Sequence, residues 1–175
     1  MKKFSEYREE TERMLQKLSV ENEKLFKSAR EVNIAVSGIG MSNGAAAEET
    51  IYNALERDMT FGGITFDDID RNINRKSKKH NVQCEFDVLL ENGDTLAIIE
   101  TKYRVRKDDV SKLVTSTLDK FRKLHPLYSN YKIMLGIGGM SFEDDAIDEA
   151  NANGVGIIQI VGDKVECQTN KIKIY

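Results

Sequence analysis

The chain has 175 residues, of which 26 are basic and 29 acidic, and a formal net charge of −3. This length is enough for one sizeable hydrophobic core. The net charge argues against a protein that coats nucleic acid, which would be basic, but it does not exclude a nuclease, because local basic patches can contact phosphates. The sequence has no apolar N-terminal stretch of the signal-peptide type and no run long enough to span a bilayer, so we expect a cytoplasmic protein without a membrane partner.

The first segment, from Phe4 to Val32, predicts a long amphipathic helix that contains neither Gly nor Pro. Its seam positions recur every seven residues and are occupied by Phe4, Thr11, Leu18, Leu25 and Val32, and by Leu15, Asn22 and Ala29. This spacing predicts a short coiled coil with Asn22 as a register-setting polar residue, and therefore a homodimer. The alternative is a single helix packed back on the rest of the chain. We expect residues 1–33 to form this N-terminal unit and residues 34–175 to form one domain.

The next segment, Ile34 to Gly44, contains three glycines but lacks the spacing of a phosphate-binding loop, so we expect a flexible joint. A helix is predicted from about Ala45 to Met59, because its apolar residues form one stripe at helical spacing. Glu48 falls on that stripe, where a carboxylate is costly unless it is paired or bound to a cation. The alternative explanation is that Glu48 lies in the first helical turn, where the helix dipole favours acidic residues.

A strand is predicted from about Ile64 to Arg75, followed by the most informative segment, which reads QCEFDVLLENGDTLAIIETKY from Gln83 to Tyr103. Two apolar-rich runs flank Asn-Gly, a dipeptide typical of a two-residue hairpin loop whose residues both take positive φ. If Asn92 and Gly93 form that loop, Asp87 lies opposite Ile98 and Glu85 opposite Glu100.

Because strand side chains alternate between faces, we expect Glu85, Asp87, Glu100 and Lys102 on one face. The other face is predicted to be core and holds Phe86, Val88, Leu90, Ala97, Ile99 and Tyr103. Facing carboxylates destabilise a strand pair, and a divalent cation would offset their repulsion more fully than Lys102 alone. Carboxylate oxygens with water and substrate phosphate suit Mg2+, so we expect a site for Mg2+ or Mn2+. The alternative is a solvated strand face with ordinary surface charges.

After the hairpin, the pattern predicts a helix over about 108–124, a strand over 131–136 and a glycine-rich strand-to-helix turn over 136–139. A helix over 142–153 and strands over 155–161 and 164–169 complete the chain. This order predicts a mixed α/β fold, with helices covering a central mixed β-sheet.

At this point the residues resemble a known family. An Asp, a hairpin turn and Glu-x-Lys on the next strand, here Asp87, Glu100 and Lys102, are similar to the pattern of the PD-(D/E)XK nuclease superfamily, which has the restriction-endonuclease-like fold. The resemblance covers about residues 34–162 and is nearest to uncharacterised prokaryotic proteins with a coiled coil before such a domain. No Pro precedes Asp87; Phe86 stands there instead.

The resemblance implies a metal-dependent phosphodiesterase that acts on DNA. Asp87 and Glu100 would bind the metal, assisted by Glu48 and the carbonyl of Thr101; Lys102 would position the attacking water, and Glu85 would support the site. The expected contacts to nucleic acid come from basic residues on both sides of the hairpin, Arg71, Arg75, Lys76, Lys78, Lys79, Arg104, Arg106 and Lys107; the alternative is that these are solvated surface charges. The alternative function is a catalytically silent module of the same fold, which oligomerises or binds a partner through its coiled coil.

Overall fold

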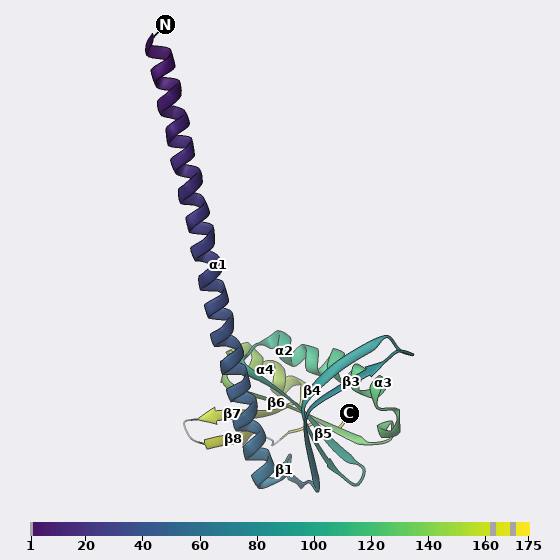
Figure 1. Ribbon diagram of the computed structural model, residues 1–175. Coiled ribbons are helices and arrows are strands. Elements are labelled where there is room, and N and C mark those ends of the chain that lie inside the picture. The colour runs from purple at the N-terminus through teal and green to yellow at the C-terminus, as the bar shows by residue number, and fades with distance from the viewer. Residues whose placement is uncertain (1, 162–163, 169–170) are drawn as a thin grey trace. The chain divides into compact units, whose positions relative to one another are not determined.

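The protein is described by a computed structural model, which covers residues 2–161, 164–168 and 171–175, with the side chains of 2–11, 26–27 and 29–41 left outside the description. It has the expected mixed α/β fold, in which a six-stranded mixed sheet is flanked by helices and an N-terminal helix is present (Figure 1). None of the helices in the described ranges is long and apolar enough to cross a membrane.

The elements follow one another in a simple order. They are α1 (Lys2–Asp58), β1 (Thr60–Phe61), β2 (Ile64–Thr65), β3 (Asp68–Ser77), β4 (Val82–Asn92), β5 (Thr95–Val105), α2 (Lys107–Lys112), the π-helical segment η1 (Leu113–Thr117), α3 (Leu118–Leu124), the short 3-10 helix η2 (Pro126–Tyr128), β6 (Lys132–Phe142), α4 (Asp144–Asn153), β7 (Gly156–Val161) and β8 (Lys164–Gln168). The chain divides into two compact units, Met1–Ser42 and Asn43–Tyr175.

The large sheet has the strand order β3-β4-β5-β6-β7-β8. The pairs β3–β4, β4–β5 and β7–β8 are antiparallel, whereas β5–β6 and β6–β7 are parallel. The two parallel pairs require crossover connections, which the helical segment 107–128 and α4 supply. The helices of both crossovers lie on one face of the sheet, and the C-terminal part of α1 lies on the other.

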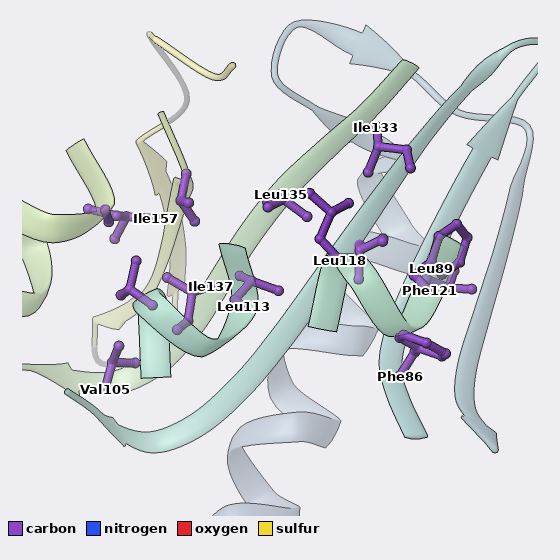
Figure 2. Close-up of a cluster of buried hydrophobic side chains, with 14 of the residues drawn as sticks. Phe86, Leu89, Val105, Leu113, Leu118, Phe121, Ile133, Leu135, Ile137 and Ile157 are labelled. Carbon is purple, nitrogen blue, oxygen red and sulfur yellow. The ribbon is translucent and has the colours of Figure 1, made fainter. Parts of the chain in front are cut away.

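One hydrophobic cluster joins the sheet to α2, η1, α3 and α4, and it includes Phe86, Leu113, Phe121 and Ile137. Figure 2 shows these side chains between the sheet and the helices. A second cluster joins the opposite face to the C-terminal part of α1 through Ala47, Ile51, Leu55 and residues of β4, β5 and β6. Of the apolar stripe expected here, Ile51 and Leu55 are buried, Tyr52 and Met59 are half-buried, and Ala45 is exposed.

The glycine-containing segment Ile34 to Gly44 lies inside α1, so the expected flexible joint is wrong. A glycine in a helix interior costs only about 1 kcal/mol relative to alanine, which a helix of this length tolerates.

The expected glycine-rich turn over 136–139 is also wrong, because β6 continues to Phe142. These glycines allow close packing instead. A Cβ at Gly138 would come within 2.5 Å of Ile51 Cδ1, and one at Gly136 within 2.7 Å of Phe61 Cζ. Glycine in a strand often marks such a close approach.

His125, at the end of α3, stacks on Phe121 with ring centroids 4.5 Å apart, and its Nε2 is buried without a hydrogen-bond partner in the described part of the chain. Burial, and next the charge of Arg75, lower the pKa of His125 below its ordinary value. The unfolded chain therefore binds a proton on this side chain more readily than the folded chain does.

We accordingly expect the free energy of unfolding to fall as the pH drops below about 6.5, where the unfolded histidine becomes charged, and His125→Phe to remove this part of the dependence. Chemical denaturation between pH 7.5 and 5.5 measures the effect. His80→Phe, at an exposed position, is the control. Identical pH profiles for His125→Phe and the unmodified chain would contradict the expectation.

Candidate functional site

The loop of the β4–β5 hairpin is Gly93-Asp94, because Asn92 pairs with Thr95 and Val88 with Ile99. The expected Asn92-Gly93 loop is therefore wrong. The loop begins one residue later, and each residue of β4 faces a residue two positions further along β5 than expected. Only Gly93 of the loop has positive φ, at 58°, and the Asn92 side chain donates a hydrogen bond to the carbonyl of Thr65. This contact with β2 keeps Asn92 in the strand.

The corrected register places Asp87 one step beyond the last pair, opposite Glu100, and no longer opposite Ile98. It likewise moves Glu85 away from Glu100. A shift of two residues leaves each side chain on its original face, whereas a shift of one would exchange the faces. The register alone would therefore have kept the expected grouping.

The strands also part at Asp87. The β4–β5 ladder ends at Val88–Ile99, whereas β5 continues to pair with β6 as far as Val105. On the other side of β4, the residue of β3 between the partners of Val88 and Phe86 is Asn72, which has a φ of 52°. The alternation of faces breaks here.

As a result Phe86 packs with the cluster beneath α2 to α4, whereas Val88 packs with the cluster beneath α1. The expectation that Phe86 shares a core face with Val88 is wrong for this reason. Tyr103 was also expected in the core, and it is 45% exposed.

The carboxylate of Asp87 holds β5 across the gap. Its Oδ2 accepts hydrogen bonds from the backbone N–H of Thr101, at 2.7 Å, and from Thr101 Oγ1, at 2.9 Å. Thr101 is 2% exposed, so its amide would be costly to leave without a partner. Both hydrogen bonds end on Oδ2. Among the described contacts, Oδ1 of Asp87 accepts no hydrogen bond.

Glu100 and Lys102 form an ion pair beside this contact. Lys102 Nζ donates to Glu100 Oε1 at 2.6 Å and to the carbonyl of Thr101 at 2.9 Å. Burial, and next the charge of Asp87, raise the pKa of Glu100 above its ordinary value, although Lys102 acts against both. Burial works to lower the pKa of Lys102, but the charge of Glu100 and the hydrogen bond to it outweigh burial, so the pKa is raised. Lys102 is therefore an ammonium group at neutral pH.

Glu48, on α1, is half-buried at the edge of the same region. Partial burial, and next the charge of Asp87, raise its pKa; Lys102 lowers it and Glu85 raises it. Glu48 and Asp87 line one cavity of about 170 Å³, together with Glu49, Tyr52 and Arg71. The side chain of Glu85 is exposed, and its negative charge contributes to the raised pKa of Glu48.

Glu100 and Lys102 line a different cavity, of about 150 Å³, against η1 and the ends of its neighbouring helices. Asp87 is not among the residues that line this second cavity; it contacts the strand of Glu100 and Lys102 through Thr101, and its charge acts on both side chains. Within the ranges that the structure describes, no three His, Cys, Asp or Glu side chains are already gathered around a point that could hold a metal ion.

Half of the eight basic residues expected to contact nucleic acid lie within 4.0 Å of a carboxylate. Arg71 lies 4.7 Å over the ring of Tyr52 and 3.9 Å from Glu49. Arg104 and Arg106 both reach Glu143, at 3.1 and 3.8 Å, and Lys107 reaches Glu149 at 3.7 Å. Arg75 lines a separate cavity with His125, and the remaining three, Lys76, Lys78 and Lys79, are exposed.

The sequence reasoning missed four residues that face Glu100 and Lys102 across the smaller cavity, namely Lys112, Ser116, Thr117 and Lys120. Three of them follow one another at a spacing of four on the helical segment after the Glu-x-Lys strand. That spacing was the available signal.

Comparison with known proteins leaves the family open. No family model and no curated protein matches the chain. A crystal structure of a protein of unknown function, AF1548, is similar at 16% identity and a TM-score of 0.40, covering 64% of this chain and 55% of that one. The small subunit of the heterodimeric restriction endonuclease R.BspD6I is similar at 12% identity and a TM-score of 0.38, covering 66% and 61%. The chain thus spans 55% and 61% of the two proteins, and similarities of this size assign neither family nor function.

The raised pKa of Glu100 has a consequence for stability. Because the folded chain favours the neutral carboxyl group, the charged form costs stability once the pH rises through the folded pKa, and this cost is absent below the unfolded pKa. We expect Glu100→Gln to raise the Tm of the metal-free chain at pH 8 by about 2–4 °C, as an effect on the order of 1 kcal/mol does in a chain of this length.

Calorimetry at pH 8 and pH 4 tests this, since the gain should disappear at pH 4. Glu166→Gln, which removes the same charge from an exposed position on β8, should leave Tm unchanged. A lower Tm for Glu100→Gln at pH 8 would mean that the ion pair with Lys102 dominates over burial and repulsion.

Proposed function

We propose that the chain is a metal-dependent phosphodiester hydrolase of the PD-(D/E)XK superfamily that acts on DNA. Asp87 and Glu100 would hold Mg2+ or Mn2+, with the carbonyl of Thr101 and with Glu48 as a further or water-mediated ligand. The single observation that carries the proposal is the set of hydrogen bonds linking Asp87, Thr101, Lys102 and Glu100 where β4 leaves β5.

The donor set suits a hard divalent cation. Mg2+ prefers carboxylate and carbonyl oxygens and keeps several waters. The pKa values of Glu48 and Glu100 are raised by burial and by the charge of Asp87, so positive charge is in deficit around these three carboxylates. A cation between them would relieve that repulsion. As a metal ligand, Glu100 would give up part of its contact with Lys102.

The residues then divide the chemistry between them. A bound metal would supply a water of lowered pKa and stabilise the negative charge that develops on the phosphoryl oxygens. Lys102 would orient the attacking water and stabilise the charge that develops on the phosphoryl oxygens. Asp87 keeps Thr101 in place, which positions the Thr101 carbonyl.

Plasmid digestion tests the proposal. We expect cleavage with Mg2+ or Mn2+ and none in EDTA, and a loss of at least about 100-fold in rate for Lys102→Ala, because a preorganised charge at the reacting phosphate is removed. Asp87→Asn should lose a similar factor, since the amide oxygen can still accept from Thr101 but carries no charge. Asparagine is a better test than alanine, because alanine would leave the buried N–H of Thr101 without a hydrogen-bond acceptor.

Glu166→Gln is the control and should cleave at the unmodified rate. Equal digestion by the unmodified chain, Asp87→Asn and Lys102→Ala would assign the cleavage to a contaminant and remove the catalytic proposal. Incubation with single-stranded DNA and RNA in parallel identifies the preferred substrate.

The second candidate function is a silent module that associates through its N-terminal helix, and two observations favour it. No metal-binding group is preassembled in the described ranges, and five large apolar side chains in the described part of α1 are 51–67% exposed, namely Met14, Leu15, Leu18, Val20 and Leu25. Leu15, Leu18 and Leu25 lie on the heptad seam with the exposed Asn22. The seam residues Phe4, Thr11, Ala29 and Val32 lie outside the described side chains.

The coiled coil and the homodimer stay predictions, and α1 provides a matched pair of variants to test them. We expect sedimentation to give a dimer that Leu18→Glu converts to a monomer, because a charge enters the seam. Val20→Glu adds the same charge at a similarly exposed position, 51% against 54%, on the opposite side of the helix, and should stay dimeric. A monomeric unmodified chain, or equal effects of both variants, would contradict the coiled coil.

A further inference from the structure

The cavity of about 150 Å³ that Glu100 and Lys102 line has a second wall whose residues the proposed chemistry does not use. This wall is the helical segment that follows β5, and it contributes the exposed Lys112 and the half-buried Ser116, Thr117 and Lys120. Leu113, which is fully buried, closes the cavity toward the core. Cations and hydroxyl donors thus face the Glu100–Lys102 pair.

Lys112 and Lys120 are available to an anion. In the described part of the chain neither has a carboxylate within 4.0 Å, whereas Lys107, Lys123 and Lys132 are each paired with one. Burial raises the pKa of the Cys84 thiol on β4, and the charge of Lys120 acts against that rise. The ammonium group of Lys120 therefore lies within electrostatic reach of the strand that carries Asp87.

The local helix geometry helps to align these side chains. In a regular α-helix with 3.6 residues per turn, residues four apart drift around the axis by about 40° at each step. The π-helical segment Leu113–Thr117 has i→i+5 hydrogen bonding and takes an additional residue into its turn. Lys112, Ser116 and Lys120, which span this wider turn, are consequently brought more nearly into one row than a regular helix would bring them.

One carboxylate, that of Asp109, also lines the cavity. Its Oδ2 accepts a hydrogen bond from the backbone N–H of Arg106 at 3.0 Å, as part of the capping of α2. The positive end of the helix dipole offsets acidic charge in this first turn. The net charge that the helical wall presents is therefore positive.

We propose that this cavity binds a backbone phosphate of DNA, held by the ammonium groups of Lys112 and Lys120 and by hydroxyl hydrogen bonds from Ser116 and Thr117. The inference rests on the proposed function for the identity of the ligand and deepens it by naming the residues that place the backbone beside Glu100 and Lys102. Ammonium groups bind phosphate as point charges and release counterions from DNA, so the contact is independent of base sequence and sensitive to salt. This phosphate would lie next to the reacting phosphate, whose developing charge Lys102 stabilises in the proposed function.

Binding is measured by fluorescence anisotropy with a labelled 20-base-pair DNA in EDTA, where no metal-dependent cleavage occurs, at several salt concentrations. We expect Lys112→Ala/Lys120→Ala to raise Kd by roughly 10-fold or more and to reduce the slope of log K against log salt by about two, one for each lost phosphate contact. Lys112→Arg/Lys120→Arg should stay near the unmodified Kd, because the charges are kept. Lys123→Ala/Lys132→Ala removes the same charge from two lysines already paired with carboxylates and should change neither quantity appreciably.

The outcomes separate this inference from the proposed function. Unchanged affinity and salt slope for Lys112→Ala/Lys120→Ala, equal losses in the control double variant, or no binding by the unmodified chain would overturn the inference. If plasmid cleavage depends on Asp87 while Lys112→Ala/Lys120→Ala binds normally, the catalytic proposal survives and the phosphate site falls. If the double variant loses binding while no chain cleaves in Mn2+, the phosphate site stands and catalysis falls. Unchanged melting temperatures for the variants exclude unfolding as the cause of lost binding.

Discussion

The hydrogen bonds from Thr101 to the carboxylate of Asp87 close the gap that opens where β4 leaves β5. A strand that loses its neighbour exposes backbone groups that must find other partners, and a buried N–H without one costs on the order of 1–3 kcal/mol. Asp87 supplies that partner for Thr101. The same carboxylate is thus a structural part of the sheet and an acidic group of the candidate site, where it lines a cavity with Glu48 and its charge raises the pKa of Glu100.

The two hydrophobic layers bring further charges to this gap. A Cβ at Gly138 would collide with Ile51, so its absence lets α1 pack closely on β6. Glu48 precedes Ile51 by three residues on α1, and this packing brings it within electrostatic reach of Asp87. On the other face, buried Leu113 and Leu118 anchor the helical segment that follows β5. Lys112 and Lys120 therefore face Glu100 and Lys102.

Charge balance makes this region responsive to ligands. Three carboxylates share one close ammonium group, and burial raises the pKa values of Glu48 and Glu100. Under the proposed function, a cation would balance the carboxylates, and an anion would balance the charges of Lys112 and Lys120. In the proposed function, a bound metal and a bound phosphate would supply these opposite charges.

The sequence by itself determined the elements whose signals are local. The apolar stripe around Ile51, the hairpin between two apolar runs and the Glu-x-Lys strand were all predictable, because side-chain periodicity depends only on the backbone geometry of one element. Tertiary contacts decided the rest. The hydrogen bond from Asn92 to Thr65 set the hairpin register. The glycines lie inside β6 because α1 and Phe61 pack closely against them. Where β4 parts from β5, Asp87 turned toward Thr101. Each of these depends on residues that are distant along the chain, and a periodic pattern within one element carries no information about them.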